Sequence, residues 1–367
     1  MKSSASLPSK SWFHAYPLSL VRNVLILMVV GVFFIYSASF RTGEGFAHRQ
    51  FLWILVSFVF LFLTILAGYR FFLGMAYPLY LAAIGLLIGV LFLGETRLGA
   101  QRWIELGAFS FQPSEFAKMA TALALVNFLG SRNPLEGEGR VILGTGLLVG
   151  IPFMLILKQP DLGSAILLIP LLGVLLFLWG IRYRYLIFSF LGALAGSPFL
   201  WGFLKGYQKK RILVFLNPNL DPLGTGYTAI QSRIAVGSGG LFGKGWLHGT
   251  QSQLDFIPEH HTDFIFSVMG EELGFMGSVF LLFLYGILFY QIFQVIERTT
   301  DVKGKLLASG VLSLLFFQVF INVGMSFGLM PITGITLPFI SYGGSSLVVN
   351  TIALGLLLSI YKERSIF

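Results

Sequence analysis

The residues best suited to chemistry gather in one polar stretch, 205–263, set between strongly apolar segments. It holds the carboxylates Asp221, Asp255, Glu259 and Asp263 and the histidines His248, His260 and His261. Asp255 lies between Leu254 and Phe256 in an apolar run, where burial would make the carboxylate a better base. We therefore take Asp255 as a candidate catalytic residue, with an exposed surface charge as the alternative.

The other carboxylates have structural explanations. Asp221 lies in a proline-rich turn, Glu259 follows a proline, and Asp263 precedes an apolar run that it can cap. The histidines fit no zinc motif, and the adjacent side chains of His260 and His261 must diverge. The metal ligands stay unassigned, although a weakly held Mg²⁺ or Mn²⁺ could bridge a carboxylate and a substrate diphosphate.

Basic side chains in and beside this stretch indicate an anionic ligand. The stretch carries Lys209, Lys210, Arg211, Arg233 and Lys244. Phosphates of a lipid-linked substrate would fit these cations, and attraction to anionic membrane lipids is the alternative. Upstream, Arg102 stands beside Trp103, where it is either an interfacial anchor or a phosphate clamp.

A second polar group lies within an apolar segment. Glu115 and Lys118 follow Pro113 and are spaced i, i+3, so they share one face of a helix. A lone charge near the bilayer centre costs about 2.5–3.5 kcal/mol, so such residues are usually paired or line a wet cavity. This group is either a structural ion pair or the polar wall of a substrate cavity that opens outward.

The composition sets the class of protein that must position these residues. The 367 residues are 56% hydrophobic and 11% charged, whereas soluble domains carry about 25% charged residues. The chain is therefore an integral membrane protein. It contains no cysteine, which excludes disulfides, thiolate metal sites and a thiol nucleophile. The net charge of +9 comes from short loops between apolar runs and does not indicate nucleic-acid binding.

Apolar runs of about 17–25 residues predict about ten membrane helices. They fall near 21–40, 51–68, 72–94, 114–130, 141–157, 164–181, 186–204, 264–294, 306–326 and 342–361. We predict an all-α polytopic membrane protein, a single domain over 1–367, with 205–263 as a long structured loop between helices 7 and 8. The segment 256–272 is alternatively a separate interfacial or re-entrant helix. The first run ends in Ser37-Ala-Ser39 like a signal peptide, but we take it as an uncleaved membrane helix.

The distribution of Lys and Arg predicts the orientation. With both ends inside, the inner segments carry Lys2, Lys10, Arg22, Arg70, Arg132, Arg140, Arg182, Arg184, Arg298, Lys303, Lys305, Lys362 and Arg364. The short outer loops carry only Arg41, Arg49, Arg97, Arg102 and Lys158. By the positive-inside rule both termini are cytoplasmic and the long loop is extracytoplasmic. The inverse orientation would place the loop near nucleotides, but its glycine-rich run 237–245 lacks the phosphate-loop pattern.

The segment 322–346 contains prolines and glycines that interrupt helical structure at the outer membrane surface. Irregular backbone at that depth is tolerated where it is buried in protein or lines a cavity. A tight turn with small residues for helix packing is the alternative, but it does not explain the length.

Taken together, the motifs resemble the SEDS family (shape, elongation, division and sporulation), most closely its rod-shape member. The matching segments are Gly99–Ile104, Phe111–Lys118, Gln159–Gly163, Arg211–Pro218, Leu254–Gly274 and Asn322–Ser346. The resemblance spans nearly the whole chain, and such a set of motifs in order is very specific.

The resemblance implies a peptidoglycan glycosyltransferase with ten membrane helices that polymerises lipid II outside the inner membrane, for cell elongation and rod shape. It implies that Asp255 is the essential catalytic residue, acting as general base, so that Asp255→Asn should abolish glycan synthesis. The predicted substrate-binding residues are Arg102, Glu115, Lys118, Arg211, Lys244 and Ser341. Mg²⁺ or Mn²⁺ is the candidate cofactor. The implied partners are lipid II, a class B penicillin-binding protein and other membrane proteins of the elongation complex, without nucleic acid.

Two other classes of function stay open. A lipid II flippase would also need a polar cavity with basic residues, but one reachable from both faces of the membrane. A non-catalytic scaffold for the penicillin-binding protein would tolerate the loss of Asp255.

Overall fold

The computed structural model of the chain describes residues 18–41, 43–97, 100–106, 109–132, 138–203, 206–222 and 224–364. Gly99, the first residue of one family segment, lies outside these residues. So do Lys2 and Lys10, which contribute to the predicted orientation.

Long helices make up most of the structure. They are α1 (Leu18–Ala38), α2 (Phe46–Ala67), α3 (Tyr69–Gly74), α4 (Ala76–Leu93), α5 (Pro113–Gly130), α6 (Glu138–Lys158), α7 (Leu162–Trp179), α8 (Tyr183–Phe203), α9 (Gly206–Leu216), α10 (Thr225–Ser238), α11 (Thr250–Gln253), α12 (Ile265–Arg298), α13 (Val302–Ser326) and α14 (Gly344–Arg364), with a 3₁₀ turn η2 (Pro218–Leu220). A three-stranded antiparallel sheet consists of β1 (Glu95–Arg97), β2 (Ala100–Leu106) and β3 (Phe109–Phe111).

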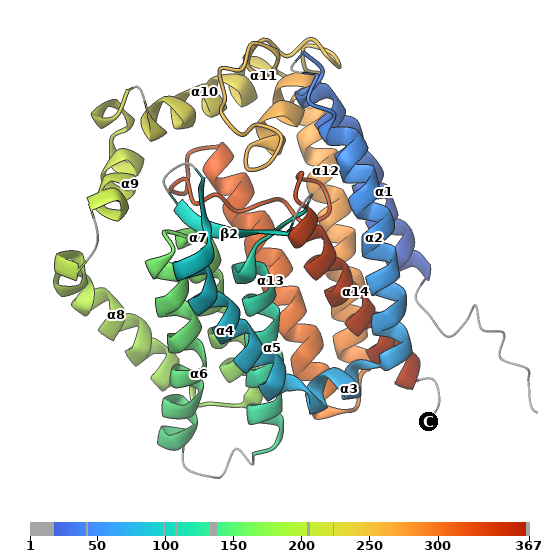
Figure 1. Ribbon diagram of the computed structural model, residues 1–367, viewed down its shortest axis with the longest axis vertical. Helices are drawn as coiled ribbons and strands as arrows, with labels where there is room; N and C mark the ends of the chain where they lie inside the picture. Colours follow the sequence, from blue (N-terminus) through green and yellow to red (C-terminus); the bar gives the residue numbers. More distant parts are fainter. Residues whose placement is uncertain are drawn as a thin grey trace, which may run out of the picture.

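The helices pack as a bundle around α13 and α14 (Figure 1). In these two helices 72% and 78% of the most apolar window is buried inside the protein, against 28% in α2, α4 and α6. α13 packs against α5, α7 and α12, and α14 packs against α2. Peripheral side chains such as Phe62 and Phe92 point outward and are exposed, as expected for helices that face lipid tails.

Eight of the helices in the described part are long and apolar enough to cross a membrane. They correspond to eight of the ten predicted spans. The spans predicted near 114–130 and 186–204 correspond to α5 and α8, which are not among the eight. α5 has a lower hydropathy because its first turns carry Glu115 and Lys118, and almost all of it is buried by other helices.

The prediction of an all-α fold is wrong in one segment. Three strands within the segment predicted as a loop, 95–97, 100–106 and 109–111, form the small sheet, whose central strand β2 packs on α4 and α5. This strand places Arg102 beside the N-terminus of α5. In addition, the span predicted at 72–94 is divided into α3 and α4 by a break at Met75.

The long stretch 205–263 is itself largely helical. Its helices α10 and α11 lie across one end of the bundle, α9 lies at its side between α8 and α10 (Figure 1), and α10 packs on α12. The stretch is therefore a structured part of the protein, as predicted from its content of large apolar residues.

The glycine-rich run in this stretch has a structural role, which its sequence did not reveal. α12 is broken at Gly274, whose φ of 65° and ψ of −156° are not helical. The freed N–H groups of Phe275 and Met276 donate to the carbonyl oxygens of Gly240 and Leu241, at 2.8 and 3.1 Å. A Cβ on Gly274 would lie 2.4 Å from the backbone nitrogen of Gly243, so only glycine fits there. The part of α12 before Gly274 is thus a separate helical segment. The alternative prediction of a separate helix at 256–272 agrees with this segment from Ile265 onward.

Candidate active site

The loop between α13 and α14 and the last residues before α12 form the centre of the candidate site. The side-chain amide of Asn322 donates to the carbonyl oxygens of Asp263 and Ile335, at 2.8 and 2.7 Å. Ser341 Oγ donates to the carbonyl oxygen of Thr262, at 2.5 Å, and accepts from the N–H of Leu337. The irregular segment after α13 is therefore fastened to the backbone that carries Asp263.

Asp263 is a partly buried carboxylate with an unusual proton affinity. Burial raises the pKa of Asp263 to about 6, although the guanidinium of Arg102 acts in the opposite direction. A base with a pKa near the working pH combines a large ionised fraction with a high affinity for a proton. Asp263 therefore has the properties of a general base.

Gly334 leaves room for this carboxylate and the guanidinium of Arg102 to lie near each other. Its φ is +74°, and a Cβ there would lie 3.3 Å from Asp263 Oδ2 and 3.7 Å from Arg102 Nη1. The Nε of Arg102 is buried and finds no hydrogen-bond acceptor among the described residues. The guanidinium thus retains a donor for an oxygen atom of a ligand.

A second carboxylate, Asp161, faces the same guanidinium. Burial alone would raise the pKa of Asp161, but Arg102, Ser114 and Ser164 together hold it below its usual value. The Ser114 hydroxyl donates to Asp161 Oδ2 at 2.7 Å, and the Ser164 N–H donates to Oδ1 at 3.1 Å, so Asp161 caps α7. Asp161 is therefore an anchor whose contacts favour the ionised form, and Asp263, whose pKa is raised, is the better suited of the two to accept a proton.

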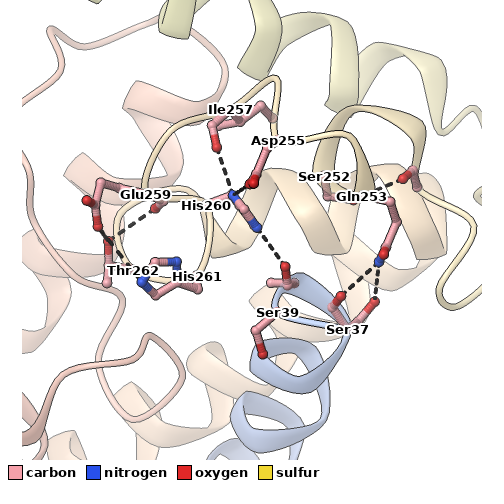
Figure 2. A network of polar contacts seen from close by, with 12 residues as sticks. Ser37, Ser39, Ser252, Gln253, Asp255, Ile257, Glu259, His260, His261 and Thr262 are labelled. Atoms are coloured by element: carbon pink, nitrogen blue, oxygen red, sulfur yellow. Dashed lines mark hydrogen bonds and ion pairs between the residues drawn. The ribbon is translucent and has the colours of Figure 1, made fainter. Parts of the chain in front are cut away.

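Asp255, the predicted base, occupies a different environment (Figure 2). Its side chain is 61% exposed, and Oδ1 lies 3.5 Å from Nδ1 of the buried His260. Of the two interpretations of Asp255, the exposed charge is the one that the structure shows, because the apolar neighbours Leu254 and Phe256 are themselves exposed on a tight turn. Its catalytic role stays a prediction.

The turn that carries Asp255 is held against the end of α1. His260 Nε2 lies 2.7 Å from the carbonyl oxygen of Ala38, and Nδ1 lies 2.8 Å from that of Ile257 (Figure 2). Nearby, Gln253 Nε2 donates to the carbonyl oxygen of Ser37 at 2.8 Å. These contacts anchor the turn but give Asp255 itself no burial.

The histidines do not form a metal site in the described part of the chain, where no group of three or more His, Asp or Glu side chains is close enough to hold an ion. His261 stacks on Phe46 with ring centroids 4.1 Å apart. Burial, followed by the neighbouring His260, lowers the pKa of His261 to about 4, so it is neutral at pH 7.

The structure separates the predicted substrate-binding residues. Arg102 joins Asp263, and Ser341 holds the backbone next to it. Lys118 Nζ and Glu115 Oε1 form a buried ion pair of 2.7 Å, which lines a small pocket with Gln318 and Asn350. Their substrate-binding role stays a prediction, and the geometry assigns them to the interior of the bundle.

The two remaining predicted residues lie elsewhere. Lys244 Nζ is 2.7 Å from Glu271 Oε1, and this fully buried carboxylate also accepts from the N–H groups of Gln251 and Ser252. Arg211 lies in a second pocket, which it shares with Arg233. Neither residue is part of the cluster around Asp263.

Sequence reasoning missed Asp263 and Asp161 as site residues. Asp263 was interpreted as a helix cap, and Asp161 was noted only as part of the segment Gln159–Gly163. One signal could have found them, because each lies in a segment matched to the family and next to a membrane helix. An acidic residue at such a place is expected to have a function.

Comparison with known proteins identifies the family. The profile of the FtsW, RodA and SpoVE proteins, described as cell cycle protein, matches residues 18–366. The chain belongs to the FtsW/RodA/SpoVE family. The resemblance predicted from the motifs is thereby confirmed.

Individual members of the FtsW/RodA/SpoVE family are similar over almost the whole chain. The peptidoglycan glycosyltransferase MrdB of Escherichia coli (strain K12) is 41% identical over 346 residues, which cover 93% of this chain and 92% of that protein. A chain of a peptidoglycan synthase complex that coordinates polymerization and crosslinking has a TM-score of 0.82 and 35% identity, covering 95% of this chain and 98% of that one. The rod shape determining protein RodA of Thermus thermophilus has a TM-score of 0.72 and 33% identity, with the same coverage.

Proposed function

We propose that this protein is a peptidoglycan glycosyltransferase that polymerises lipid II into glycan strands for cell elongation and rod shape. Relatives that it matches over almost their full length carry this activity in their names. The observation that carries the proposal is the partly buried carboxylate of Asp263, with its raised pKa, beside the guanidinium of Arg102.

The reaction joins two lipid-linked sugars. The 4-hydroxyl of the acceptor GlcNAc attacks the anomeric carbon of a MurNAc on undecaprenyl diphosphate, with inversion. A C–O bond forms to the acceptor oxygen, the bond from the anomeric carbon to the diphosphate oxygen breaks, and the diphosphate leaves with the bonding electrons. The hydroxyl proton passes to a carboxylate as bond formation acidifies it. No covalent nucleophile is required.

We assign the general base to Asp263, in preference to the predicted Asp255. Asp263 is held by Asn322 on a fixed backbone and has a pKa of about 6, whereas Asp255 is mostly exposed on a turn. Arg102 lies next to Asp263 and retains a buried N–H donor, which can bind an oxygen of the leaving diphosphate and stabilise its developing charge.

A divalent cation, Mg²⁺ or Mn²⁺, is proposed as an auxiliary ligand of the diphosphate. The described residues around Asp263 supply few ligands for it, because the oxygens of Asp161 accept from Ser114, Gln112 and Ser164. A cation would therefore take most of its ligands from the diphosphate and from water. When bound, it would neutralise part of the charge that develops on the leaving group.

The proposed setting is the bacterial cytoplasmic membrane. Ten spans, with both termini in the cytoplasm, would place α9, α10, α11 and the candidate site at the extracytoplasmic face, where the polar heads of lipid-linked sugars lie. A class B penicillin-binding protein that crosslinks the product, and other membrane proteins of the elongation complex, are the proposed partners. The similarity to a chain of a peptidoglycan synthase complex supports this proposal.

The test is polymerisation of purified lipid II by the detergent-solubilised protein, with and without Mg²⁺ or Mn²⁺. We expect long glycan from the wild type and none from Asp263→Asn, with Asp255→Asn as the matched charge-neutralising control. Glycan from Asp263→Asn at the wild-type rate would refute the assignment of the base. No glycan from the wild type, even with the partner transpeptidase, would favour a flippase or a scaffold, and movement of labelled lipid II across proteoliposomes would identify the flippase.

A further inference from the structure

His260 is a buried histidine in the turn between α11 and α12, and both of its ring nitrogens face oxygen atoms of the backbone (Figure 2). Nε2 lies 2.7 Å from the carbonyl oxygen of Ala38 at the end of α1, and Nδ1 lies 2.8 Å from that of Ile257. The side chain is only 6% exposed, so the ring is largely shielded from water. Each nitrogen therefore depends on its carbonyl partner for a hydrogen bond.

The two carbonyl groups determine which protonation state of the ring fits. A carbonyl oxygen can only accept a hydrogen bond, so a ring nitrogen must carry a proton to bind one. A neutral imidazole has one N–H group and one lone pair, and either tautomer would direct that lone pair at a carbonyl oxygen. Only the doubly protonated ring donates to Ala38 and Ile257 together. The arrangement of the carbonyls therefore selects the imidazolium cation.

The charged surroundings of the ring suit a cation. A buried charge needs a partner, and Asp255 Oδ1 lies 3.5 Å from Nδ1 of His260. The ring of His261 has its centroid 5.7 Å from that of His260, but it is neutral at pH 7 and adds no opposing charge. The other charged side chains of this region act on His261, Phe46 or Ser37: Glu44 and Glu259, Arg49, and Glu272, respectively.

The turn that carries His260 needs support, because part of its backbone is strained. Asp255 and Glu259 have positive φ values of 57° and 53°, which residues with a side chain rarely adopt and which surrounding contacts have to maintain. Gln253 before the turn and His260 within it contact successive carbonyl groups at the end of α1. Contacts with α1 at both ends of the turn thus hold its shape.

The other side of the turn is fastened to the loop between α13 and α14. Ser341 Oγ donates to the carbonyl oxygen of Thr262 at 2.5 Å, and the Tyr342 N–H donates to that of His261 at 3.0 Å. Asp263 follows directly. The ring of His260 is therefore a link between α1 and the backbone that leads to the candidate base.

We propose that His260 is a positively charged positioning residue, an imidazolium that clamps the turn 254–263 to α1 and pairs with the carboxylate of Asp255. The clamp fixes the backbone from which Asp263 reaches the site. This positioning role rests on the proposed function, whereas the charge of the ring follows from the carbonyl contacts alone.

The protonation state can be measured directly, because a ring nitrogen that carries a proton and one with a free lone pair have very different ¹⁵N chemical shifts. The full-length protein in nanodiscs is labelled with ¹³C,¹⁵N-histidine and ¹³C-glutamate. Glu259-His260 is the only Glu-His pair in the sequence, so the His260 signals are identified without a variant. At pH 7 we expect two protonated ring nitrogens in His260 and one in His261. One protonated nitrogen in His260 would overturn the inference.

Two variants test the clamp. His260→Arg keeps a positive charge with several N–H donors, whereas His260→Gln keeps a donor without the charge. We expect hydrogen exchange of the backbone amides in 254–263 to stay within about twofold of the wild type in His260→Arg and to become about tenfold faster in His260→Gln. The kcat for lipid II should fall in His260→Gln and be retained in His260→Arg.

His248→Gln is the matched control, because His248 is exposed and its ring contacts one carbonyl oxygen, that of Trp246, which a neutral ring can bind. It should leave exchange in the turn unchanged. Equal exchange in His260→Arg and His260→Gln would overturn the clamp. Wild-type protein with the expected ring protonation and exchange but without polymerisation would refute the proposed function alone, so the two can fail independently.

Discussion

Asn322 of α13 and Asp263 before α12 are joined by a hydrogen bond of 2.8 Å, from the side-chain amide of one to the backbone carbonyl of the other. The second N–H of the same amide donates to the carbonyl oxygen of Ile335. A single fully buried side chain therefore positions both the candidate base and the loop that faces it.

Replacement of Asn322 should affect stability and catalysis together. Asn322→Leu leaves the carbonyls of Asp263 and Ile335 buried without this donor, and each such group costs about 1–3 kcal/mol. We expect a clear fall in the Tm of the solubilised protein and a lower kcat for polymerisation. An unchanged Tm and kcat would show that the amide does not hold the site.

The pH dependence of polymerisation should report Asp263. Because its pKa is raised to about 6, the ionised base is lost as the pH falls through that value, so kcat/KM should drop on the acid side of about pH 6. Asp255→Asn should keep this acid limb. A profile that is flat from pH 5 to 8 in the wild type would contradict the assignment.

The same raised pKa has an effect on stability. The ordinary pKa of an aspartate is 3.8, so between about pH 4 and 6 the folded protein binds more protons at Asp263 than the unfolded chain does. The contribution of Asp263 to stability therefore falls as the pH rises through this window. Asp263→Asn should raise the Tm at pH 7 relative to the wild type and leave it nearly unchanged at pH 4. A lower Tm of this variant at pH 7 would contradict the expectation.

The rate effects of the two candidate bases should differ. Removal of a general base typically costs about 10²–10⁴-fold in rate, so Asp263→Asn should lose at least about a hundredfold in kcat. Asp255→Asn removes an exposed carboxylate and should keep most of the activity. Single-turnover polymerisation by both variants, measured at a temperature at which both are folded, decides between the two candidate bases. A larger loss of kcat in Asp255→Asn than in Asp263→Asn would instead support Asp255 as the base.

Gly334 should not tolerate a side chain. Gly334→Ala places a Cβ on a left-handed residue, which costs about 1–2 kcal/mol, and pushes it against Asp263 and Arg102. We expect a loss of polymerisation and a lower Tm. Gly89→Ala in α4, where no heavy atom lies within 4 Å of the new Cβ, is the matched control and should change neither.

Lys244 allows a test of a predicted substrate-binding residue. In the structure it pairs with the fully buried Glu271, so Lys244→Gln should lower the Tm and change KM for lipid II little. A rise in KM without a change in Tm would instead support the predicted contact with substrate.

Much of the fold could be predicted from the sequence, because membrane spans are apolar runs of fixed length. The predicted span at α5 shows the limit of this signal, since α5 carries an ion pair that its burial by neighbouring helices explains. The small sheet β1–β3 was not predicted, because its strands are short and lie within a polar loop.

The site was less predictable than the fold. The apolar neighbourhood of Asp255 in the sequence left its burial open, and in the structure the side chains of Leu254 and Phe256 are exposed with it. The environment of Asp263 depends on Arg102 and Gly334, which are far away in sequence. Burial of a single carboxylate is a tertiary property, and neighbours along the chain are poor indicators of it.

The contacts between α1 and the turn at Asp255 bear on whether the first helix can be removed. Within the stretch that resembles a signal-peptidase site, the carbonyl oxygen of Ser37 accepts a hydrogen bond from Gln253, and that of Ala38 lies against Nε2 of His260. Proteolysis after this stretch would detach the acceptors and release the turn from the bundle. The end of the first helix is thus part of the support of the turn at Asp255, so an intact first helix and a fixed turn depend on each other.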